Sequence, residues 1–515
     1  MSSGILRQGQ RMAVKLHVKN YGGYSYYSYR SRNETSYLRC YDRNGGGCPA
    51  IGKIVNGEPL LTINHNHDRN PLLCGQNDFQ KALYKATINR PFQSMRLIYD
   101  HLSQLHSVAA TSLTWVKMQP AMQRWRSKVR PQHPANSRDL MEYAEQLQLP
   151  QWQHLIRYNN GELNVHTIPV TDGSFVTVIS DVNFLGLLNP TTFFMDATFK
   201  ITPRKPKVYQ VFSIMGLVDD TALPICWMLM TAKSSSAYSA GLTYFKDVLA
   251  PHIQPQTFIT DFEISLRNSI LFTFPQAKHV GCLFHYCQAL MRKFKKFNLL
   301  QLCKEWIPGQ IIIRKFMALA LLPHQDIPAG FDWLVTNLPA DIRRIFDPFI
   351  AYYRRQWLIR ETPARYSVYN EKHRSNNYSE ASNRRNKLRF GIHPSIWTFT
   401  EKLRDLQAVT HLELLSLFRG EPVIREPRSQ TLKRDEDINN AWILYEQNIL
   451  NIQSFLAYAS FFLKPAYQEE EQNLNNMDIV TDEEEDVLEV GGVILQPPEY
   501  YYAMEVFHEI DVVFE

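Results

Sequence analysis

Three carboxylates, Asp196, Asp261 and Glu380, lie far apart in the chain but stand in segments that could bring them together. Asp196 is the one charged residue of the apolar run 193–199, and Asp261 ends the apolar run 257–261. We expect both runs to be strands and Glu380 to lie on a later helix, so that the three meet at one edge of a sheet. Three carboxylates there could hold two hard cations about 4 Å apart. Such a pair activates a water or a 3′-hydroxyl and stabilises the leaving oxygen of a phosphodiester.

Each carboxylate also has a simpler explanation. Asp196 could be a structural side chain that accepts hydrogen bonds from backbone amides. Asp261 comes directly before an expected helix, where Asp is a favoured N-cap. Glu380 ends the run 377–380, which resembles a capping box, or it could simply lie on a surface. Only the three together favour a shared metal site.

The strand that carries Asp196 is expected to be central in its sheet. Side chains alternate along a strand, so Phe194, Asp196 and Thr198 share one face. The opposite face carries Phe193, Met195, Ala197 and Phe199. Both faces are apolar, which is typical of a strand covered on both sides. A carboxylate in such a strand is costly to bury unless it is paired or bound to a metal.

A second group of residues suits a different metal. Cys40, Cys48, His65 and His67 form a four-ligand set in a Tyr- and Gly-rich segment that has few aliphatic residues. Zinc prefers four sulfur and imidazole ligands, and a small module without a core can gain its fold from them. The alternative is two incidental thiols and two surface histidines. The sequence favours a structural zinc site.

Composition and charge point to nucleic acid as a partner. The chain has 515 residues and a net charge of 56 − 50 = +6, but residues 465–515 contain 15 Asp/Glu and no Lys/Arg. The remaining 464 residues therefore carry 56 − 35 = +21. No apolar run is long enough to span a membrane, and the first residues do not resemble a secretory signal, so we expect no membrane partner. The chain has seven cysteines, and since no export signal is visible, metal ligation or buried thiols are better explanations for them than disulfides.

Three basic runs interleave cations with aromatic or polar residues, as phosphate-binding surfaces do. They could equally be solvated helix faces, and none is a clear nuclear-import signal. The candidate DNA contacts are Arg124, Arg126, Lys128 and Arg130; Arg292, Lys293, Lys295 and Lys296; and Arg384, Arg385 and Lys387.

The blocks around the carboxylates resemble those of Mutator-like (MULE) transposases. The run 281–290, with Cys282 and His285, resembles the family's Cys-x-x-His block. The runs 196–199 and 260–263 resemble its first and second carboxylate blocks, and 376–397 resembles its third. The resemblance covers about residues 185–415.

The resemblance implies a ribonuclease-H-like mixed sheet with a helical insertion before the last carboxylate. It also implies that Asp196, Asp261 and Glu380 are a catalytic DDE triad that uses magnesium or manganese. Asn383 stands where many relatives have His, and it can hydrogen bond but cannot act as an acid near neutral pH. For Cys282 and His285, support by packing and a direct role with metal or DNA both stay open, because Cys287 is nearby but no fourth ligand is evident.

The Cys/His set also resembles a family pattern. The run 36–40, the step Gly47-Cys48-Pro49-Ala50 and the closing His65-Asn66-His67 resemble a FLYWCH-type zinc finger. Leu38 stands where that family usually has Trp. Its members bind DNA or protein, so the resemblance implies either partner.

These interpretations divide the chain into eight segments within an α/β fold class. We expect a disordered N-terminus (1–20), the zinc finger (21–72), a helical and basic DNA-binding region (73–165), the first part of the transposase core (166–300), the helical insertion (301–370), the end of the core (371–420), C-terminal helices (421–464) and a disordered acidic tail (465–515).

The leading hypothesis is a nuclear DNA transposase that cleaves transposon ends and joins them to double-stranded target DNA. The alternative is a domesticated descendant that binds DNA and regulates transcription without cutting. A third class is a protein-interaction scaffold that uses the finger and the acidic tail. A homo-oligomer is expected only by analogy, since transposases usually bring two DNA ends together.

Overall fold

The computed structural model describes residues 18–463 except for 33–34, 44–45, 91–92, 132–133, 135–138, 301–305 and 426–428. The chain forms two compact units, of which the first contains the residues up to 133 together with 148–155 and 396–402. The second unit contains the others. Residues 1–17 of the predicted N-terminal segment and the whole predicted acidic tail (465–515) lie outside the described residues.

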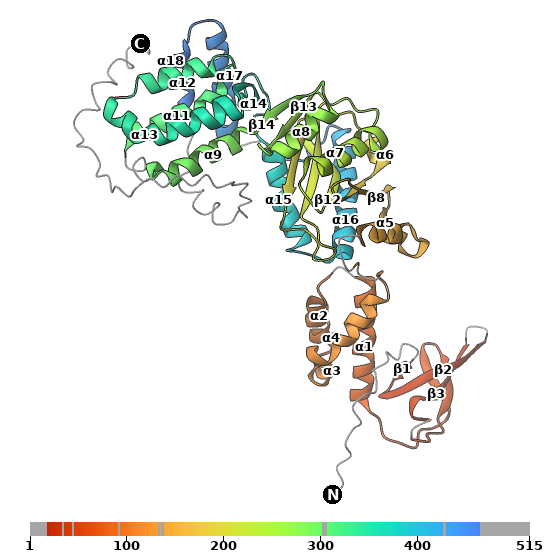
Figure 1. The fold of residues 1–515 in the computed structure, drawn as a ribbon. Helices are drawn as coiled ribbons and strands as arrows, with labels where there is room; N and C mark the ends of the chain where they lie inside the picture. Colours follow the sequence, from red (N-terminus) through yellow and green to blue (C-terminus); the bar gives the residue numbers. More distant parts are fainter. Residues whose placement is uncertain are drawn as a thin grey trace. The chain divides into compact units, whose positions relative to one another are not determined.

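The first unit begins with a five-stranded antiparallel sheet whose strands follow one another in chain order (Figure 1). Asn56 and Gly57 connect the last two strands and both have positive φ, the backbone that a tight hairpin needs. The strands are β1 (Val18–Tyr21), β2 (Tyr24–Arg32), β3 (Thr35–Cys40), β4 (Ile51–Val55) and β5 (Glu58–Ile63), with the short helix η1 (Tyr41–Arg43) after β3.

Four helices follow this sheet and form a small core of their own around Phe79, Met122 and Trp125. The first helix begins after Asn70, whose side chain accepts the backbone N–H of Leu73. The side chain of Asn20 in β1 donates to the carbonyl of Cys74 at 3.0 Å and so ties helix to sheet. The helices are α1 (Pro71–Asn89), α2 (Met95–Leu105), α3 (Ser107–Ser112) and α4 (Trp115–Ser127), and the unit also includes η2 (Pro150–Leu155).

The second unit is built on a seven-stranded mixed sheet of order β14-β13-β10-β11-β12-β9-β8. Strands β10, β13 and β14 are parallel, whereas β11, β12, β9 and β8 pair antiparallel. This confirms the mixed α/β architecture and the N-terminal antiparallel sheet. The strands are β8 (Asn164–Pro169), β9 (Phe175–Ser180), β10 (Thr192–Thr198), β11 (Gln210–Val218), β12 (Thr221–Met230), β13 (Thr257–Thr260) and β14 (Lys278–Gly281), besides the small pair β6 (Arg157–Tyr158) and β7 (Gly161–Glu162).

The two faces of β10 lie in two different hydrophobic clusters. Phe193 and Met195 belong to a cluster with side chains of α7 and α8, and Phe194 belongs to the other. The central position predicted for this strand is confirmed, because both of its apolar faces are buried. Helices of the sheet region are α5 (Asp139–Gln148), α6 (Val182–Leu185), α7 (Ser235–Tyr244) with η3 (Phe245–Leu249), α8 (Ile264–Thr273), α9 (Leu283–Lys296), α15 (Asn377–Phe390) and α16 (Ile396–Leu417).

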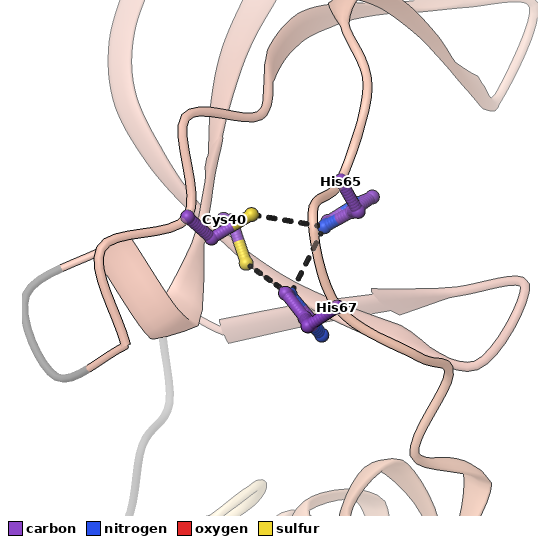
Figure 2. Close-up of side chains that lie close together, drawn as sticks. Cys40, His65 and His67 are labelled. Atoms are coloured by element: carbon purple, nitrogen blue, oxygen red, sulfur yellow. Dashed lines mark hydrogen bonds between the residues drawn. The ribbon is translucent and has the colours of Figure 1, made fainter.

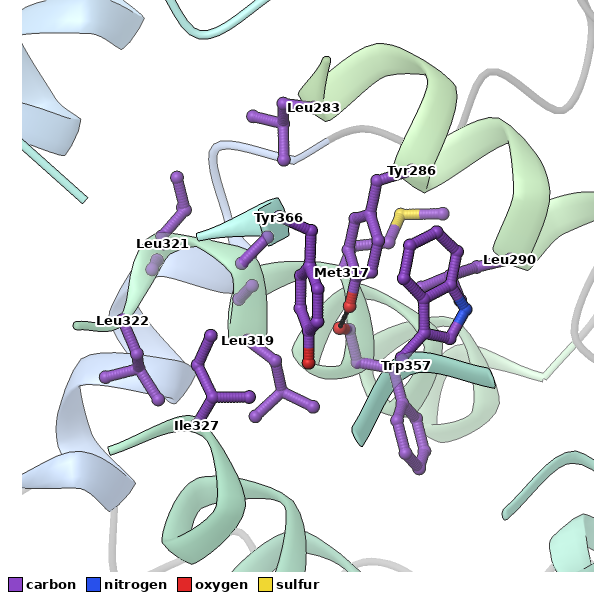
Figure 3. Packing of buried hydrophobic residues seen from close by; sticks show 14 of the residues in the cluster. Leu283, Tyr286, Leu290, Met317, Leu319, Leu321, Leu322, Ile327, Trp357 and Tyr366 are labelled. Atoms are coloured by element: carbon purple, nitrogen blue, oxygen red, sulfur yellow. Dashed lines mark hydrogen bonds between the residues drawn. The ribbon is translucent and has the colours of Figure 1, made fainter. Parts of the chain in front are cut away.

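The hydrophobic cluster that contains Phe194 continues into a helical region (Figure 3). Tyr286 of α9 donates to the carbonyl of Phe316 at 2.8 Å and lies 2.8 Å from the hydroxyl of Tyr353. The late helices return to this core, since the indole of Trp442 donates to the carbonyl of Leu321 at 2.8 Å. The helices are α11 (Ile307–Ala318), η4 (Leu319–Leu321), α12 (Ile327–Thr336), α13 (Ala340–Tyr353), η5 (Arg354–Arg360), α14 (Pro363–Tyr366), α17 (Ser429–Glu446) and α18 (Ile452–Ser460). Among the described residues, no helix combines the length and the apolar character that a membrane crossing requires.

Candidate metal centres

The N-terminal Cys/His set converges in the structure. The ligand atoms of Cys40, Cys48, His65 and His67 all lie within 4.8 Å of one another. Cys40 Sγ lies 3.3 Å from His67 Nε2, Cys48 Sγ lies 3.4 Å from His65 Nδ1, and the two imidazole nitrogens are 3.2 Å apart (Figure 2). Two sulfur and two nitrogen donors in one pocket fit a tetrahedral zinc ion.

The second ring nitrogen of each histidine contacts a group outside the Cys/His cluster. His65 Nε2 lies 2.8 Å from the Tyr26 hydroxyl, and His67 Nδ1 lies 2.8 Å from the carbonyl of Asp68. Such contacts fix which nitrogen faces the metal. Burial raises the pKa of the Cys40 thiol to about 11 and that of Tyr26 to about 12 in the protein without metal. A bound cation would reverse this effect for Cys40, because it stabilises the thiolate.

In the second unit, the register of the parallel strands puts Asp196 and Asp261 at the same level. Phe194 pairs with Ile259, so continuing this register brings Asp196 level with Asp261, whose charge acts on it. On the next strand Thr260 pairs with Gly281, so Asp261 stands level with Cys282. The carboxyl ends of parallel strands are where open α/β sheets gather functional groups.

Helix α15 brings Glu380 to the same place. The Asn383 side chain, three residues after Glu380, donates to Asp196 Oδ2 at 2.8 Å. Just before the helix, Asn376 donates through its side chain to the carbonyl of Met195 at 2.8 Å. Glu380 Oε1 lies 3.8 Å from His285 Nε2. The sequence-predicted carboxylates are therefore gathered around the ends of β10, β13 and α15.

Burial and neighbouring charges raise the pKa values of two carboxyls in this group. Burial, and then the charge of Asp261, raises the pKa of Asp196 well above its usual range, and Glu380 adds to the effect. Burial raises the pKa of Glu380 to about 7, with Arg384 opposing the shift. Within the described residues, Glu380 Oε1 is buried without a hydrogen-bond partner. Oxygen donors in this state fit Mg²⁺ or Mn²⁺, which would replace the missing positive charge.

The simpler explanations of the carboxylates fit the structure less well. Glu263, not Asp261, occupies the N-cap of α8, although Asp261 Oδ1 accepts the Glu263 N–H at 3.1 Å. Asn376 occupies the N-cap of α15 without a side-chain cap bond, so Glu380 is not part of a capping box. Asp196 does accept one backbone amide, that of Ala197 at 2.9 Å. That single bond leaves its other oxygen to Asn383.

Cys282 and His285 lie at the start of α9, beside Glu380. The ligand atoms of these three residues lie within 4.8 Å of one another. Cys282 is fully buried, and its Sγ accepts the backbone N–H of Asn376 at 3.1 Å. Cys287 packs instead at the edge of the helical hydrophobic cluster. Glu380, and not Cys287, is therefore the third residue of this group.

The first basic run divides into exposed and internal side chains. Arg124 and Lys128 are exposed. Arg126 donates to the carbonyl of Gln93 at 2.8 Å, and burial lowers its pKa to about 10. Arg130 forms a buried ion pair with Glu401 at 2.6 Å. Half of this run is therefore engaged within the first unit.

The other two runs are more accessible. Arg292, Lys295 and Lys296 are exposed in α9, whereas Lys293 is half-buried with its ammonium over the ring of Tyr352. Arg384, Arg385 and Lys387 are all exposed on α15. Residues three or four apart share a helix face, so Arg384 and Lys387 continue the face that carries Glu380.

Asn376 is the residue of this region that the sequence did not point to. It is fully buried and links three segments, through its N–H to Cys282 and through its side chain to Met195. An Asn-Asn pair before a helix is typical of a loop or a cap, so no local signal indicates such a position.

Comparison with known proteins identifies one domain. Residues 192–289 match the family model of the MULE transposase domain. The match runs from β10 to α9, so it includes Asp196, Asp261, Cys282 and His285 but ends before Glu380, and it does not reach the N-terminal sheet. A comparison with curated proteins finds no matching relative. The matched domain supports a transposase-type function and implies DNA binding.

Proposed function

We propose that the chain is a metal-dependent DNA transposase of Mutator-like type in which Asp196, Asp261 and Glu380 are the catalytic carboxylates. The observation that carries this proposal is the meeting of these three side chains at the ends of β10, β13 and α15, inside or beside the matched domain. A pure binding module has no need of three carboxylates whose charges oppose one another.

The sheet order supports a ribonuclease-H-like core. The first three strands from β10 to β12 form an antiparallel meander, and β13 and β14 then add in parallel on the other side of β10. This order suits the ribonuclease-H-like mixed sheet that we propose. Strands β9 and β8 extend the antiparallel edge. We assign the helices from α11 to α14 to the helical insertion expected before Glu380.

The residues would divide the chemistry among them. Asp196, Asp261 and Glu380 would hold Mg²⁺ or Mn²⁺, which when bound supplies an activated nucleophile and neutralises the leaving oxygen. Asn383 fixes the carboxylate of Asp196 through its amide. The exposed cations on α15 and α9 would neutralise phosphates on either side of the scissile bond.

The remaining segments take supporting roles in this proposal. Residues 21–72 act as a FLYWCH-type finger that holds zinc through its two cysteines and two histidines. Residues 73–165 add a helical contact to DNA. The protein works in the nucleus, and a homo-oligomer brings two transposon ends together.

Strand cleavage tests the proposal. Purified full-length protein is incubated with candidate transposon ends and Mg²⁺ or Mn²⁺. Asp196→Asn is expected to lower cleavage by about three orders of magnitude or more, since it removes a charge that the transition state requires. The matched control is Asp247→Asn, which changes an exposed carboxylate of η3 and should leave cleavage unchanged. Undiminished cleavage in Asp196→Asn would sink the triad, and DNA binding without any cleavage would favour a domesticated protein.

A further inference from the structure

We propose that Cys282, His285 and Glu380 form a second metal site in this unit, one that takes a borderline transition-metal ion such as Zn²⁺. The inference rests on the proposed function in one respect only, which is that Glu380 is shared with the carboxylate site. Metal binding itself can be tested without any catalytic activity.

The backbone brings the sulfur and the imidazole together. Cys282 is the residue before the first turn of α9, and His285 lies within that turn. A separation of three residues at a helix start puts two side chains on the same side. Glu380 arrives from α15 with its Oε1 3.8 Å from His285 Nε2. All three ligand atoms lie within 4.8 Å of one another, as the ligands of one small ion do.

Two features beside Cys282 suit a metal-bound sulfur, whereas burial alone raises the pKa of the thiol to about 12. Its Sγ accepts the backbone N–H of Asn376 at 3.1 Å, a contact that also stabilises metal-bound sulfur in other sites. Its place at the N-terminus of a 14-residue helix adds the positive end of the helix dipole.

Two buried polar atoms beside the sulfur have no hydrogen-bond partner among the described residues. They are His285 Nδ1 and Glu380 Oε1. Buried polar atoms are almost always satisfied, so an imidazole nitrogen and a carboxylate oxygen without partners in one place fit a site that an ion completes. A thiol that served only for packing would not explain why an imidazole and a carboxylate are left in this state.

The donor set selects the ion. One sulfur, one nitrogen and one oxygen suit Zn²⁺ far better than Mg²⁺, which prefers oxygen and water. Three protein ligands leave a fourth position open, which distinguishes this site from the closed N-terminal cluster. Because Glu380 cannot serve both sites fully, Zn²⁺ bound here would withdraw it from Asp196 and Asp261. Zinc should therefore inhibit strand cleavage that Mg²⁺ or Mn²⁺ supports.

Metal counting on the full-length chain tests the site. With Zn²⁺ as the probe, the wild type should bind about two equivalents, one in the N-terminal cluster and one here. Cys282→Ser should bind about one, since serine keeps an acceptor for the Asn376 N–H but is a poor zinc ligand. The matched control, Cys287→Ser, changes a thiol of the same helix that lies outside the group and should retain about two.

Glu380→Gln gives a second variant that does not depend on the thiol. It should weaken the second equivalent by at least about tenfold and leave the first unchanged. Circular dichroism shows whether each variant is folded. Wild type that binds about one equivalent, or Cys282→Ser that still binds about two, would overturn the proposal. Both results are read without cleavage, so an inactive protein would refute the transposase function and leave this site standing.

Discussion

The N-terminal Cys/His cluster and the carboxylate group of the second unit are assembled in opposite ways. The N-terminal cluster draws its four ligands from residues 40–67, and both histidines are held by contacts within the same module. The carboxylate group draws on residues 196, 261 and 380, which three separate elements bring together. The first centre could build its fold around the ion, whereas the second is placed on a sheet that two hydrophobic clusters already stabilise.

The difference also appears in the chemistry. The N-terminal cluster offers two sulfurs and two nitrogens, and the hydrophobic cluster around it is small, formed by Cys40, Cys48 and Ala50. The carboxylate group offers oxygen donors, and burial raises the pKa of both Asp196 and Glu380. Loss of metal should therefore unfold the first region and merely change the protonation of the second.

The largest expected effect follows from removing metal from the N-terminal cluster. Cys48→Ser, or a strong chelator, should remove amide protection from residues 18–70, because a structural zinc contributes about 10–16 kcal/mol of apparent free energy in small modules. Hydrogen exchange read by mass spectrometry gives the result peptide by peptide. Strands β10–β12 are the internal control and should stay protected. Unchanged protection of 18–70 would show that this sheet folds without metal.

The next effect concerns the pH dependence of the carboxylate group without metal. The pKa of Glu380 rises from 4.5 to about 7 in the folded protein, so the folded state keeps a proton that the unfolded state has released. Stability should therefore fall as pH rises from about 4.5 to 7, by roughly 3 kcal/mol at most from this group.

Glu380→Gln isolates this contribution, since glutamine does not titrate. In urea unfolding, the free energy of unfolding of the variant should rise relative to that of the wild type as pH increases. Saturating Mg²⁺ at pH 8 should stabilise only the wild type. Parallel pH curves for the two proteins would show that the Glu380 proton is not linked to folding.

A smaller effect is expected at Asn383. Asn383→Ala removes the amide that holds Asp196 Oδ2, which should lower cleavage by about tenfold, the equivalent of one hydrogen bond to a charged group. Asn383→His restores a donor and should recover most of the loss. If both variants are equally impaired, the position matters for its size and not for its hydrogen bond.

The smallest effect should come from single cations on α15. Lys387→Ala should weaken DNA binding and reduce the slope of log affinity against log salt by about 1. Lys433→Ala, which removes an exposed lysine from α17, is the matched control. Equal changes in both variants would indicate that DNA affinity depends on the net charge of the protein and not on this surface.

The local features of the structure can be predicted well from the sequence. The alternation of residues 193–199 predicts two buried faces, and the structure divides Phe193 and Phe194 between two clusters. The strands and helices around Asp196, Asp261 and Glu380 lie close to their expected positions, because apolar periodicity and turn residues such as Gly391 are local signals.

Long-range contacts are poorly predictable from the sequence. Arg130 stands in a basic run, but its partner Glu401 lies 271 residues away and nothing near Arg130 indicates the pair. Trp442 returns to Leu321 across 121 residues, so the packing of α17 against the predicted insertion was not foreseeable. Asn376 was missed for the same reason, since its role depends on segments at 195 and 282.

The division of β10 between two clusters has a consequence for how this gene can change. Every residue inserted into or deleted from the strand before position 196 would turn the carboxylate toward α7 and α8 and put Met195 or Ala197 in its place. Substitutions along the strand change one contact each, but a change of length alters the face of every later side chain. In a library of single-codon insertions and deletions, very few functional variants should therefore have a change of length in this strand, even where single substitutions are tolerated.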